Sequence, residues 1–176
     1  MLIGIISDIH DNLRHLELVS KELNKLEIDL LVICGDFAMP FTLRGLLNFK
    51  CPIKAVLGNG DPDIQKFQYQ LENLEVLKPL KLELNHRFHD FTIDGSRIGV
   101  IHNDEECLTK ALIESRLFDF LCVGHTHKPE ISVSEKTTII NPGSLVGWIY
   151  ESDGEVPIGY ATLDTTTKKA ELHQIP

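Results

Sequence analysis

Seven side chains that commonly bind metal ions are spread over five stretches of this chain, and each stretch follows a short apolar run. They are carboxylates, a carboxamide and imidazoles: Asp8, His10, Asp36, Asn59, His102, His125 and His127. These ligand types suit Mn²⁺, Fe, Ni²⁺ or Zn²⁺, whereas the lack of clustered thiolates argues against a structural zinc site. Because loops beyond the carboxyl ends of strands hold the sites of open α/β sheets, we expect the five stretches to meet in one crevice.

The first half of the chain alternates strand-length apolar runs with helical spacing. A helix is expected from Asn12 onward, where apolar residues recur along one face, and a weaker helix is expected over 42–49. Strands are expected over 2–6, 29–34 and 53–57. Such alternation predicts an α/β unit with parallel strands.

The second half is richer in strands. Asp94-Gly95 is typical of a tight hairpin turn, and it separates the runs 88–93 and 97–101. The stretch 151–157 is expected to be an exposed loop. Further short strands are expected over 118–123, 131–133, 138–140, 160–163 and 170–174.

Length and composition limit the class of protein. The 176 residues, 43% of them hydrophobic, fit one domain covering 1–176 with a core to bury. Lys and Arg number 17 against 26 Asp and Glu, and the formal charge of −9 argues against general nucleic-acid binding.

No apolar run suits a membrane span and no signal peptide is recognisable, so we expect a cytoplasmic protein that binds no membrane. Four separate cysteines without a C-x-x-C pair favour free thiols in a reducing compartment: Cys34, Cys51, Cys107 and Cys122.

The order of the motifs resembles that of the calcineurin-like metallophosphoesterases. The matching blocks are Asp8-x-His10, Gly35-Asp36, Gly58-Asn59 with an acid two residues later, a single His102, and Gly124-His125-Thr126-His127. Asn12 and the run Asn141-Pro142-Gly143-Ser144 extend the resemblance, which covers residues 7–144. By size the chain is similar to the compact, single-domain prokaryotic phosphodiesterases of that family, and it is also similar to the small retromer subunit.

This resemblance implies a fold and a metal centre. The fold class would be α/β, a four-layer αββα sandwich of two mixed β-sheets flanked by helices. Two divalent metal ions per chain are expected, Mn²⁺ first, with Ni²⁺, Fe or Zn²⁺ as alternatives. One ion would be bound by Asp8, His10, Asp36 and His127, and the other by Asn59, His102 and His125, with Asp36 bridging both. Asp36, Asn59 and His102 are the residues expected to act most directly in catalysis.

The activity that the resemblance implies is phosphoester hydrolysis, with a phosphodiester as the preferred substrate. Two ions about 3.5–4 Å apart can lower the pKa of a bridging water, so that hydroxide attacks phosphorus in line. Many members have His after Gly-Asn and small phosphodiesterases often have Cys, but this chain has Gly60. Since glycine donates no proton, substrates with acidic leaving groups are expected to be favoured.

Two other functions fit the same residues. One is a phosphomonoesterase acting on a small metabolite, and the other is a non-catalytic scaffold like the retromer subunit. The presence of all seven ligands favours catalysis, whereas Gly60 is the one feature that favours a scaffold. A small phosphoester is the expected partner, and homo-oligomer formation is left open.

Two residues near the motifs have structural interpretations. Asp61 is expected to cap a helix that begins at Pro62, and the resemblance adds a role in supporting the Asn59 loop. Asn12 is expected to cap its helix and to leave the first N–H groups facing an anion.

Other aromatic and imidazole side chains lie outside the motifs. Trp148 and Tyr150 are interpreted as core or as a self-association surface, with a substrate-facing role as the alternative. Structural or surface roles are expected for the remaining histidines: His15, His86, His89 and His173.

Overall fold

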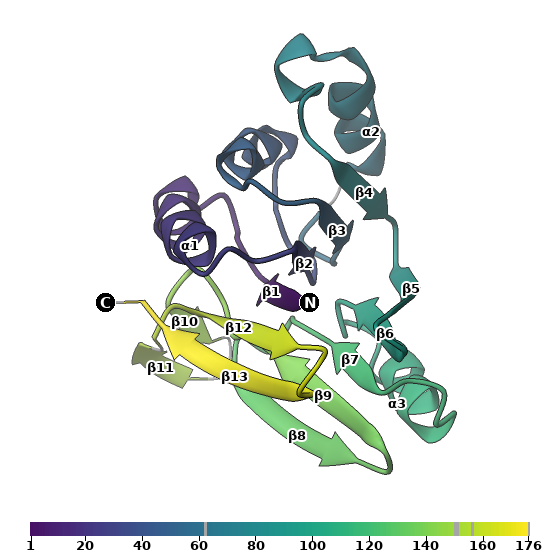
Figure 1. Cartoon of the computed structure of the whole chain (residues 1–176). Helices are drawn as coiled ribbons and strands as arrows, with labels where there is room; N and C mark the ends of the chain where they lie inside the picture. Colours follow the sequence, from purple (N-terminus) through teal and green to yellow (C-terminus); the bar gives the residue numbers. More distant parts are fainter. Residues whose placement is uncertain (62, 150–151, 156, 176) are drawn as a thin grey trace.

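The computed structural model describes residues 1–61, 63–149, 152–155 and 157–175, and two mixed β-sheets form its centre (Figure 1). In the first sheet, β1 to β4 run parallel, while β12 pairs antiparallel with both β1 and β13. Its strands in spatial order are β13 (Lys169–Gln174), β12 (Gly159–Asp164), β1 (Leu2–Ile6), β2 (Leu30–Ile33), β3 (Ile53–Val56) and β4 (Leu82–Asn85). The parallel order predicted for the first half of the chain is therefore confirmed.

The second sheet contains five strands, with β6, β7 and β9 parallel and an antiparallel strand at each edge. Its spatial order is β5 (Phe88–Ile93), β6 (Ser96–Ile101), β7 (Phe120–Cys122), β9 (Thr137–Asn141) and β8 (Glu130–Ser134). Asp94 and Gly95 join β5 to β6 with φ angles of 49° and 76°. Positive φ at both positions is the requirement of a tight hairpin turn, which the Asp-Gly pair predicted.

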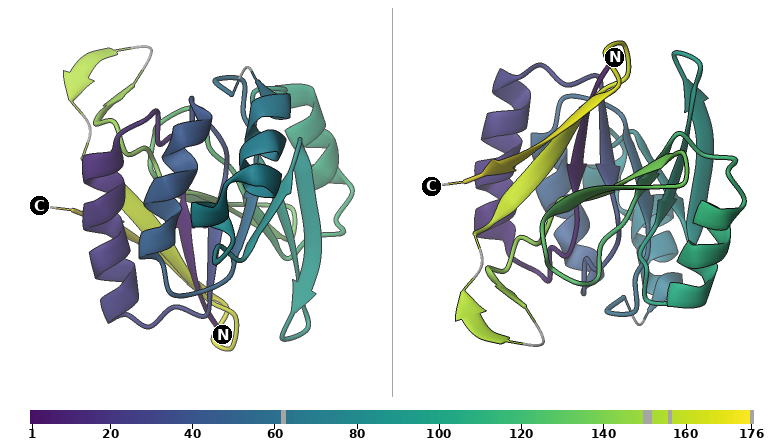
Figure 2. Two further views of the ribbon diagram at one scale, coloured as in Figure 1. Left: turned by 90° about the horizontal axis from the view of Figure 1, so that it is seen from above. Right: turned by 90° about the horizontal axis from the view of Figure 1, so that it is seen from below.

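Helices lie outside both sheets, as the two views of Figure 2 show. One apolar cluster joins the outer face of the first sheet to its helices, a second lies between the sheets, and a third joins the outer face of the second sheet to Leu112 and Ile113 of α3. The helices are α1 (Leu13–Lys25), η1 (Pro40–Asn48), α2 (Ile64–Asn73), η2 (Glu75–Leu77) and α3 (Glu106–Glu114). The predicted arrangement of two mixed sheets between helices is confirmed.

The predicted cap of α1 is also confirmed. The Asn12 side chain accepts a hydrogen bond from the N–H of His15 over 3.1 Å, which satisfies one of the free donors at the start of the helix. Leu16, Val19 and Leu23 then bury one face of α1 in the core.

The segment predicted as a weak helix over 42–49 forms the 3₁₀ helix η1 instead. Its buried apolar residues Pro40, Leu43 and Leu46 are spaced by three. A 3₁₀ helix has three residues per turn, so this spacing aligns all three side chains along one line of the helix, whereas on an α-helix they would spread over about 120°.

Two other sequence interpretations were wrong. Ser152–Glu155 forms strand β11, paired antiparallel with β10 (Trp148–Ile149), where an exposed loop was expected; Glu151 and Val156 lie outside the described residues. The second helix begins at Ile64 with Asp63 as its cap, not at Pro62 with Asp61. Pro62 itself lies outside the described residues. Asp61 is unavailable as a cap because its carboxylate binds elsewhere, as described below.

The pattern of apolar residues did not indicate β4 or α3. Side chains of β4 are only partly buried, and α3 buries Thr109 alone, so neither element carries the apolar run that marks a core strand or helix. In the part of the chain that is described, no helix combines the length and apolar character that crossing a bilayer requires.

Candidate metal centre

The loops that carry the predicted ligands are joined by backbone hydrogen bonds. The N–H groups of residues 8–11, after β1, donate to the carbonyl groups of residues 35–37, after β2, over 2.8–3.0 Å. The Gly124 N–H donates to the His102 carbonyl and the Leu145 N–H to the Asp8 carbonyl, both over 3.1 Å. These bonds connect both sheets at the carboxyl ends of their parallel strands.

The backbone is left-handed at five of the seven predicted ligands. Their φ angles are 53° at Asp8, 43° at His10, 56° at Asp36, 69° at His125 and 59° at His127. Residues other than glycine adopt this conformation at an energetic cost, and such residues cluster at functional sites. The hydrogen bonds between the loops help to maintain it.

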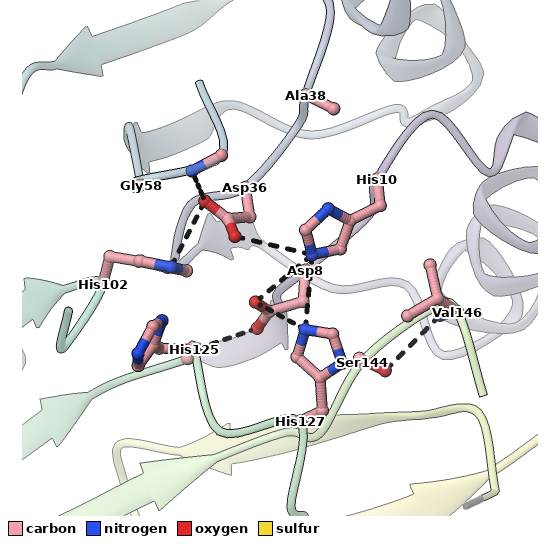
Figure 3. Close-up of polar contacts among 12 residues, drawn as sticks. Asp8, His10, Asp36, Ala38, Gly58, His102, His125, His127, Ser144 and Val146 are labelled. Atoms are coloured by element: carbon pink, nitrogen blue, oxygen red, sulfur yellow. Dashed lines mark hydrogen bonds and ion pairs between the residues drawn. The ribbon is translucent and has the colours of Figure 1, made fainter. Parts of the chain in front are cut away.

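One group of ligands surrounds the side chain of Asp8 (Figure 3). The Nε2 atoms of His10 and His127 lie 3.3 Å apart, and Asp8 Oδ1 lies 3.3 Å from His127 Nε2. Asp8 and His127 are fully buried, whereas His10 is 18% exposed. Three donor atoms that face one another at such distances can surround one metal ion at bond lengths of about 2.0–2.2 Å.

Asp36 connects this group to a second one. Its Oδ2 lies 3.4 Å from His10 Nε2, while its Oδ1 lies 3.2 Å from His102 Nε2. The carboxamide oxygen of Asn59 lies 3.1 Å from the same nitrogen of His102. The two oxygens of one carboxylate therefore face different sets of ligands.

His125 lies beside the second group. Its ring centroid is 5.2 Å from that of His102, and its backbone N–H donates to Asp8 Oδ2 over 3.0 Å. All seven residues singled out in the sequence thus lie in one region of the molecule, contributed by both sheets. Their assignment to two separate ions stays a prediction.

Two backbone carbonyls orient the buried imidazoles. His102 Nδ1 donates to the carbonyl of Cys34, and His127 Nδ1 donates to the carbonyl of Trp148, each over 2.7 Å. A proton held on Nδ1 leaves Nε2 as the ligand atom, and metal-binding histidines are commonly fixed in this way. The sequence signalled neither carbonyl, because any residue type can supply one.

The charges of the centre shift the pKa values of its groups. Burial works to lower the pKa of His102, but its hydrogen bond with Asp36 and the charges of Asp8 and Asp36 outweigh burial and raise that pKa to about 9. Burial works to raise the pKa of Asp36, yet the bond and charge of His102 leave it below its ordinary value. At His10, burial dominates and lowers the pKa.

The donor set fits divalent metal ions. His125 Nδ1 is a buried atom without a hydrogen-bond partner in the described part of the chain, and the buried Asp8 Oδ1 faces only the Nε2 atoms of His10 and His127, at 3.9 and 3.3 Å. Buried polar atoms are rarely left in this state, and a bound ion would satisfy both. The combination of imidazole nitrogens with carboxylate and carboxamide oxygens suits the metals expected from the sequence.

Metal affinity is expected to rise at least about tenfold per pH unit from pH 6.5 until it levels off near pH 9, because His102, whose pKa is raised to about 9, and His127, whose pKa is also raised, must lose a proton before their Nε2 atoms can bind an ion. Calorimetric titration with Ni²⁺ in buffers of different ionisation heat measures both the affinity and the proton released. His86→Ala removes an exposed imidazole outside the centre and should keep the wild-type slope. An affinity independent of pH in this range would mean that His102 is already neutral.

Asp61 supports the Asn59 loop from inside the protein. Its carboxylate accepts hydrogen bonds from the N–H groups of Ala38 and Gly58, both over 2.8 Å, and so joins the two loops that carry Asp36 and Asn59. Burial raises the pKa of Asp61 to about 6 in spite of these two bonds. This contact agrees with the supporting role that the family resemblance implied.

Gly60 lies directly against Asp36. Its N–H donates to Asp36 Oδ1 over 2.7 Å, and a Cβ atom at this position would lie 3.0 Å from the carboxylate. Contacts that short are rare, so a side chain here would require the carboxylate or the loop to shift. At position 60, therefore, only backbone atoms face the metal centre, and this residue supplies no side chain that could donate a proton.

The remaining predictions concern residues around the centre. Cys34 and Cys122 are fully buried, and burial raises the pKa of Cys122 to about 12, so it is no thiolate nucleophile. The sequence indicates Asn141 only as part of a motif. In the structure its Nδ2 donates hydrogen bonds to Gly124 O and Thr126 Oγ1, and so stabilises the loop that carries His125 and His127. Structural roles are confirmed for three histidines: His15 bonds to Asn12 and Leu145, His89 is buried, and His173 stacks on Tyr160.

Comparison with known proteins agrees with this geometry. The model of the calcineurin-like phosphoesterase superfamily domain matches residues 1–168. Over 149 residues, 85% of this chain and 87% of the relative, the sequence is 27% identical to phosphodiesterase MJ0936 of Methanocaldococcus jannaschii. The structure of an archaeal phosphodiesterase superposes with a TM-score of 0.86 at 25% identity, covering 99% of this chain and 100% of that one. Vps29 of Entamoeba histolytica shares the fold with a TM-score of 0.65 at 17% identity, covering 99% of this chain and 98% of that one. The chain belongs to the calcineurin-like phosphoesterase superfamily.

Proposed function

We propose that this protein is a phosphodiesterase that uses two divalent metal ions bound by the seven side chains of the centre. The observation that carries the proposal is the position of Asp36, whose Oδ2 faces His10 and whose Oδ1 faces His102 and the Gly60 N–H. A carboxylate placed between two sets of ligands is suited to bridge two ions. The relatives named as phosphodiesterases support the preference for diesters.

Each side chain has a task in this proposal. Asp8, His10, Asp36 and His127 would hold one ion, and Asn59, His102, His125 and Asp36 the other. When bound, the ions would lower the pKa of a water molecule and neutralise the phosphoryl oxygens. Manganese is the metal we propose, because oxygen ligands contribute as much as imidazoles do. His102 and His127, held at Nδ1, keep their Nε2 atoms in place without a change of rotamer.

The Asn59 loop determines which leaving groups suit the enzyme. Gly60 presents only its N–H to the centre, and that N–H is used by Asp36. A leaving group at this side receives no proton from residue 60, so esters of acidic alcohols such as phenols should react fastest.

A substrate comparison tests the proposal. Protein loaded with Mn²⁺ or Ni²⁺ is assayed with bis(p-nitrophenyl) phosphate and with p-nitrophenyl phosphate, and metal content is measured on the same sample. Faster hydrolysis of the diester is the expected result. Faster hydrolysis of the monoester would favour a phosphomonoesterase. If metal-loaded protein hydrolyses neither ester, the proposal that it is a phosphoesterase is wrong.

The scaffold function is the second candidate, since Gly60 removes the usual proton donor. It predicts a stable binding partner in pull-down experiments and an Asp36→Asn, His125→Ala variant that folds and keeps that partner. The buried, unpartnered His125 Nδ1 and the buried Asp8 Oδ1, which faces only other predicted ligands, favour catalysis, because a scaffold has no need of such atoms.

A further inference from the structure

A large aromatic side chain stands beside the metal centre without being one of its predicted ligands. Trp148 begins β10, after the loop that leaves β9, and is 41% exposed. Its ring centroid lies 4.9 Å from that of His127 and 6.3 Å from that of His10, and the planes of Trp148 and His10 differ by 30°. The hydrolytic chemistry described above makes no use of this indole. Its position next to two predicted ligands therefore calls for another explanation.

The backbone of Trp148 fixes the ring relative to the centre. The carbonyl of Trp148 accepts the hydrogen bond from His127 Nδ1, so the residue that carries the indole also orients a predicted ligand. On the Trp148 side this contact involves only the backbone carbonyl, while on the other side it involves the imidazole of His127. Replacing the side chain therefore removes the indole and leaves the acceptor of His127 in the chain.

The exposure of the ligands indicates where a substrate can approach: Asn59 of the second group is exposed and His125 is half-buried, whereas in the first group only His10 is open to solvent. Asp8 and His127 have no exposed side-chain surface, and Asp36 and His102 have 1% each. His10 is 18% exposed. The phosphate of a substrate can therefore reach the first group of ligands past His10, which is the imidazole whose ring lies nearly parallel to that of Trp148.

We propose that Trp148 forms an aromatic subsite that stacks on a flat ring attached to the substrate phosphate, either directly, as in an aryl ester, or through a sugar, as in a nucleotide. The inference rests on the proposed phosphodiesterase function and specifies its substrate class. Tryptophan offers the largest stacking surface of any side chain, and every aromatic ring or base has a face that can use it. The exposure of Trp148 contradicts a core role, and the proposal adopts the substrate-facing alternative over self-association; Tyr150 lies outside the described residues.

Fluorescence tests binding directly, because Trp148 is the only tryptophan of the chain. Protein loaded with Zn²⁺, which does not quench fluorescence, is titrated with phenyl phosphate, adenosine 5′-phosphate and methyl phosphate. Saturable quenching by one or both aromatic ligands, with about tenfold tighter binding than methyl phosphate, is expected. Quenching by only one of them shows whether the subsite prefers the ring of an aryl ester or that of a nucleotide. Equal affinities and equal spectra for all three ligands would overturn the inference.

Kinetics tests the same contact with a fixed leaving group. Phenyl p-nitrophenyl phosphate and methyl p-nitrophenyl phosphate both release p-nitrophenol and share its ring, so they differ only in the second ester group, which is a flat ring in one and a methyl group in the other. Trp148→Ala is expected to raise KM for the phenyl ester about tenfold relative to the methyl ester, and Trp148→Phe to restore most of the difference. The control Tyr69→Ala removes an aromatic ring that is 63% exposed on α2 and should keep the wild-type KM ratio.

Failure of this inference can be told apart from failure of the proposed function. If the wild-type protein hydrolyses both diesters but Trp148→Ala keeps the wild-type KM ratio, only the aromatic subsite is wrong. If the wild-type protein hydrolyses neither, the phosphodiesterase proposal fails, and the fluorescence titration still decides whether Trp148 binds aromatic phosphates.

Discussion

Asp36→Ala is expected to reduce phosphodiester hydrolysis by roughly a thousandfold or more. The two oxygens of Asp36 face different ligand sets, at 3.4 Å from His10 and 3.2 Å from His102. Alanine removes both contacts and the negative charge that would lie between two cations. The predicted result is a protein that holds fewer than two ions per chain and has almost no activity.

Metal analysis and steady-state kinetics on the same preparation measure this effect. Asn59→Ala should cost less, because Asn59 is neutral and exposed and touches only the second group. Asp63→Ala is the matched control, since it removes an aspartate that caps α2 outside the centre. It should cost about 1 kcal/mol of stability and leave activity intact. Two ions per chain and an unchanged rate in Asp36→Ala would show that the bridging assignment is wrong.

Gly58→Ala is expected to lower activity by roughly a hundredfold or more, although it changes no ligand. A Cβ atom on Gly58 would lie 2.1 Å from Asp36 Oδ1 and 2.7 Å from His102 Nε2, closer than real Cβ atoms approach such neighbours. At least one of these two side chains must move. Since a displacement of about 1 Å in a reacting group can cost a hundredfold in rate, the second metal group should lose both geometry and affinity.

Gly95→Ala is the matched control for this substitution. Gly95 lies in the β5–β6 turn with φ of 76°, and no atom lies within 4 Å of the position of its Cβ. Alanine there should cost about 1 kcal/mol through backbone strain and leave metal content and rate unchanged. Thermal unfolding and metal analysis of both variants separate strain from steric displacement. Wild-type activity in Gly58→Ala would mean that the loop relaxes away from Asp36.

Much of the fold could be predicted because buried strands and tight turns have characteristic residue patterns within a single short segment. The run 2–6 matches β1 residue for residue, and Asp94-Gly95 joins β5 to β6 as predicted. Where the residue pattern of a segment was ambiguous, the predicted secondary structure was less accurate. Pro40, Leu43 and Leu46 fit a 3₁₀ helix, and Ser152–Glu155, all polar or glycine, forms a strand only because β10 lies beside it.

The roles of single residues around the centre depended more on tertiary structure. Asp61 and Asp63 are both acids near the start of α2, and Pro62, a residue type favoured at the first helical position, made Asp61 the expected cap. The structure shows Asp63 capping the helix while Asp61 accepts from Ala38, a residue 23 positions earlier. Such a partner cannot be read from local spacing, because it is brought there by the pairing of other strands.

The sequence by itself determined which side chains are available for metal chemistry and that they follow strands, because ligand type and apolar runs are local properties. Only the tertiary structure decided how they face one another: that Asp36 lies between His10 and His102, that the carbonyls of Cys34 and Trp148 orient two imidazoles, and that an indole stands beside them. These relations join residues far apart in the chain: His102 and Cys34 are separated by 68 positions, and His10 and His127 by 117. Their distances are set by how two sheets pack, which no single segment encodes.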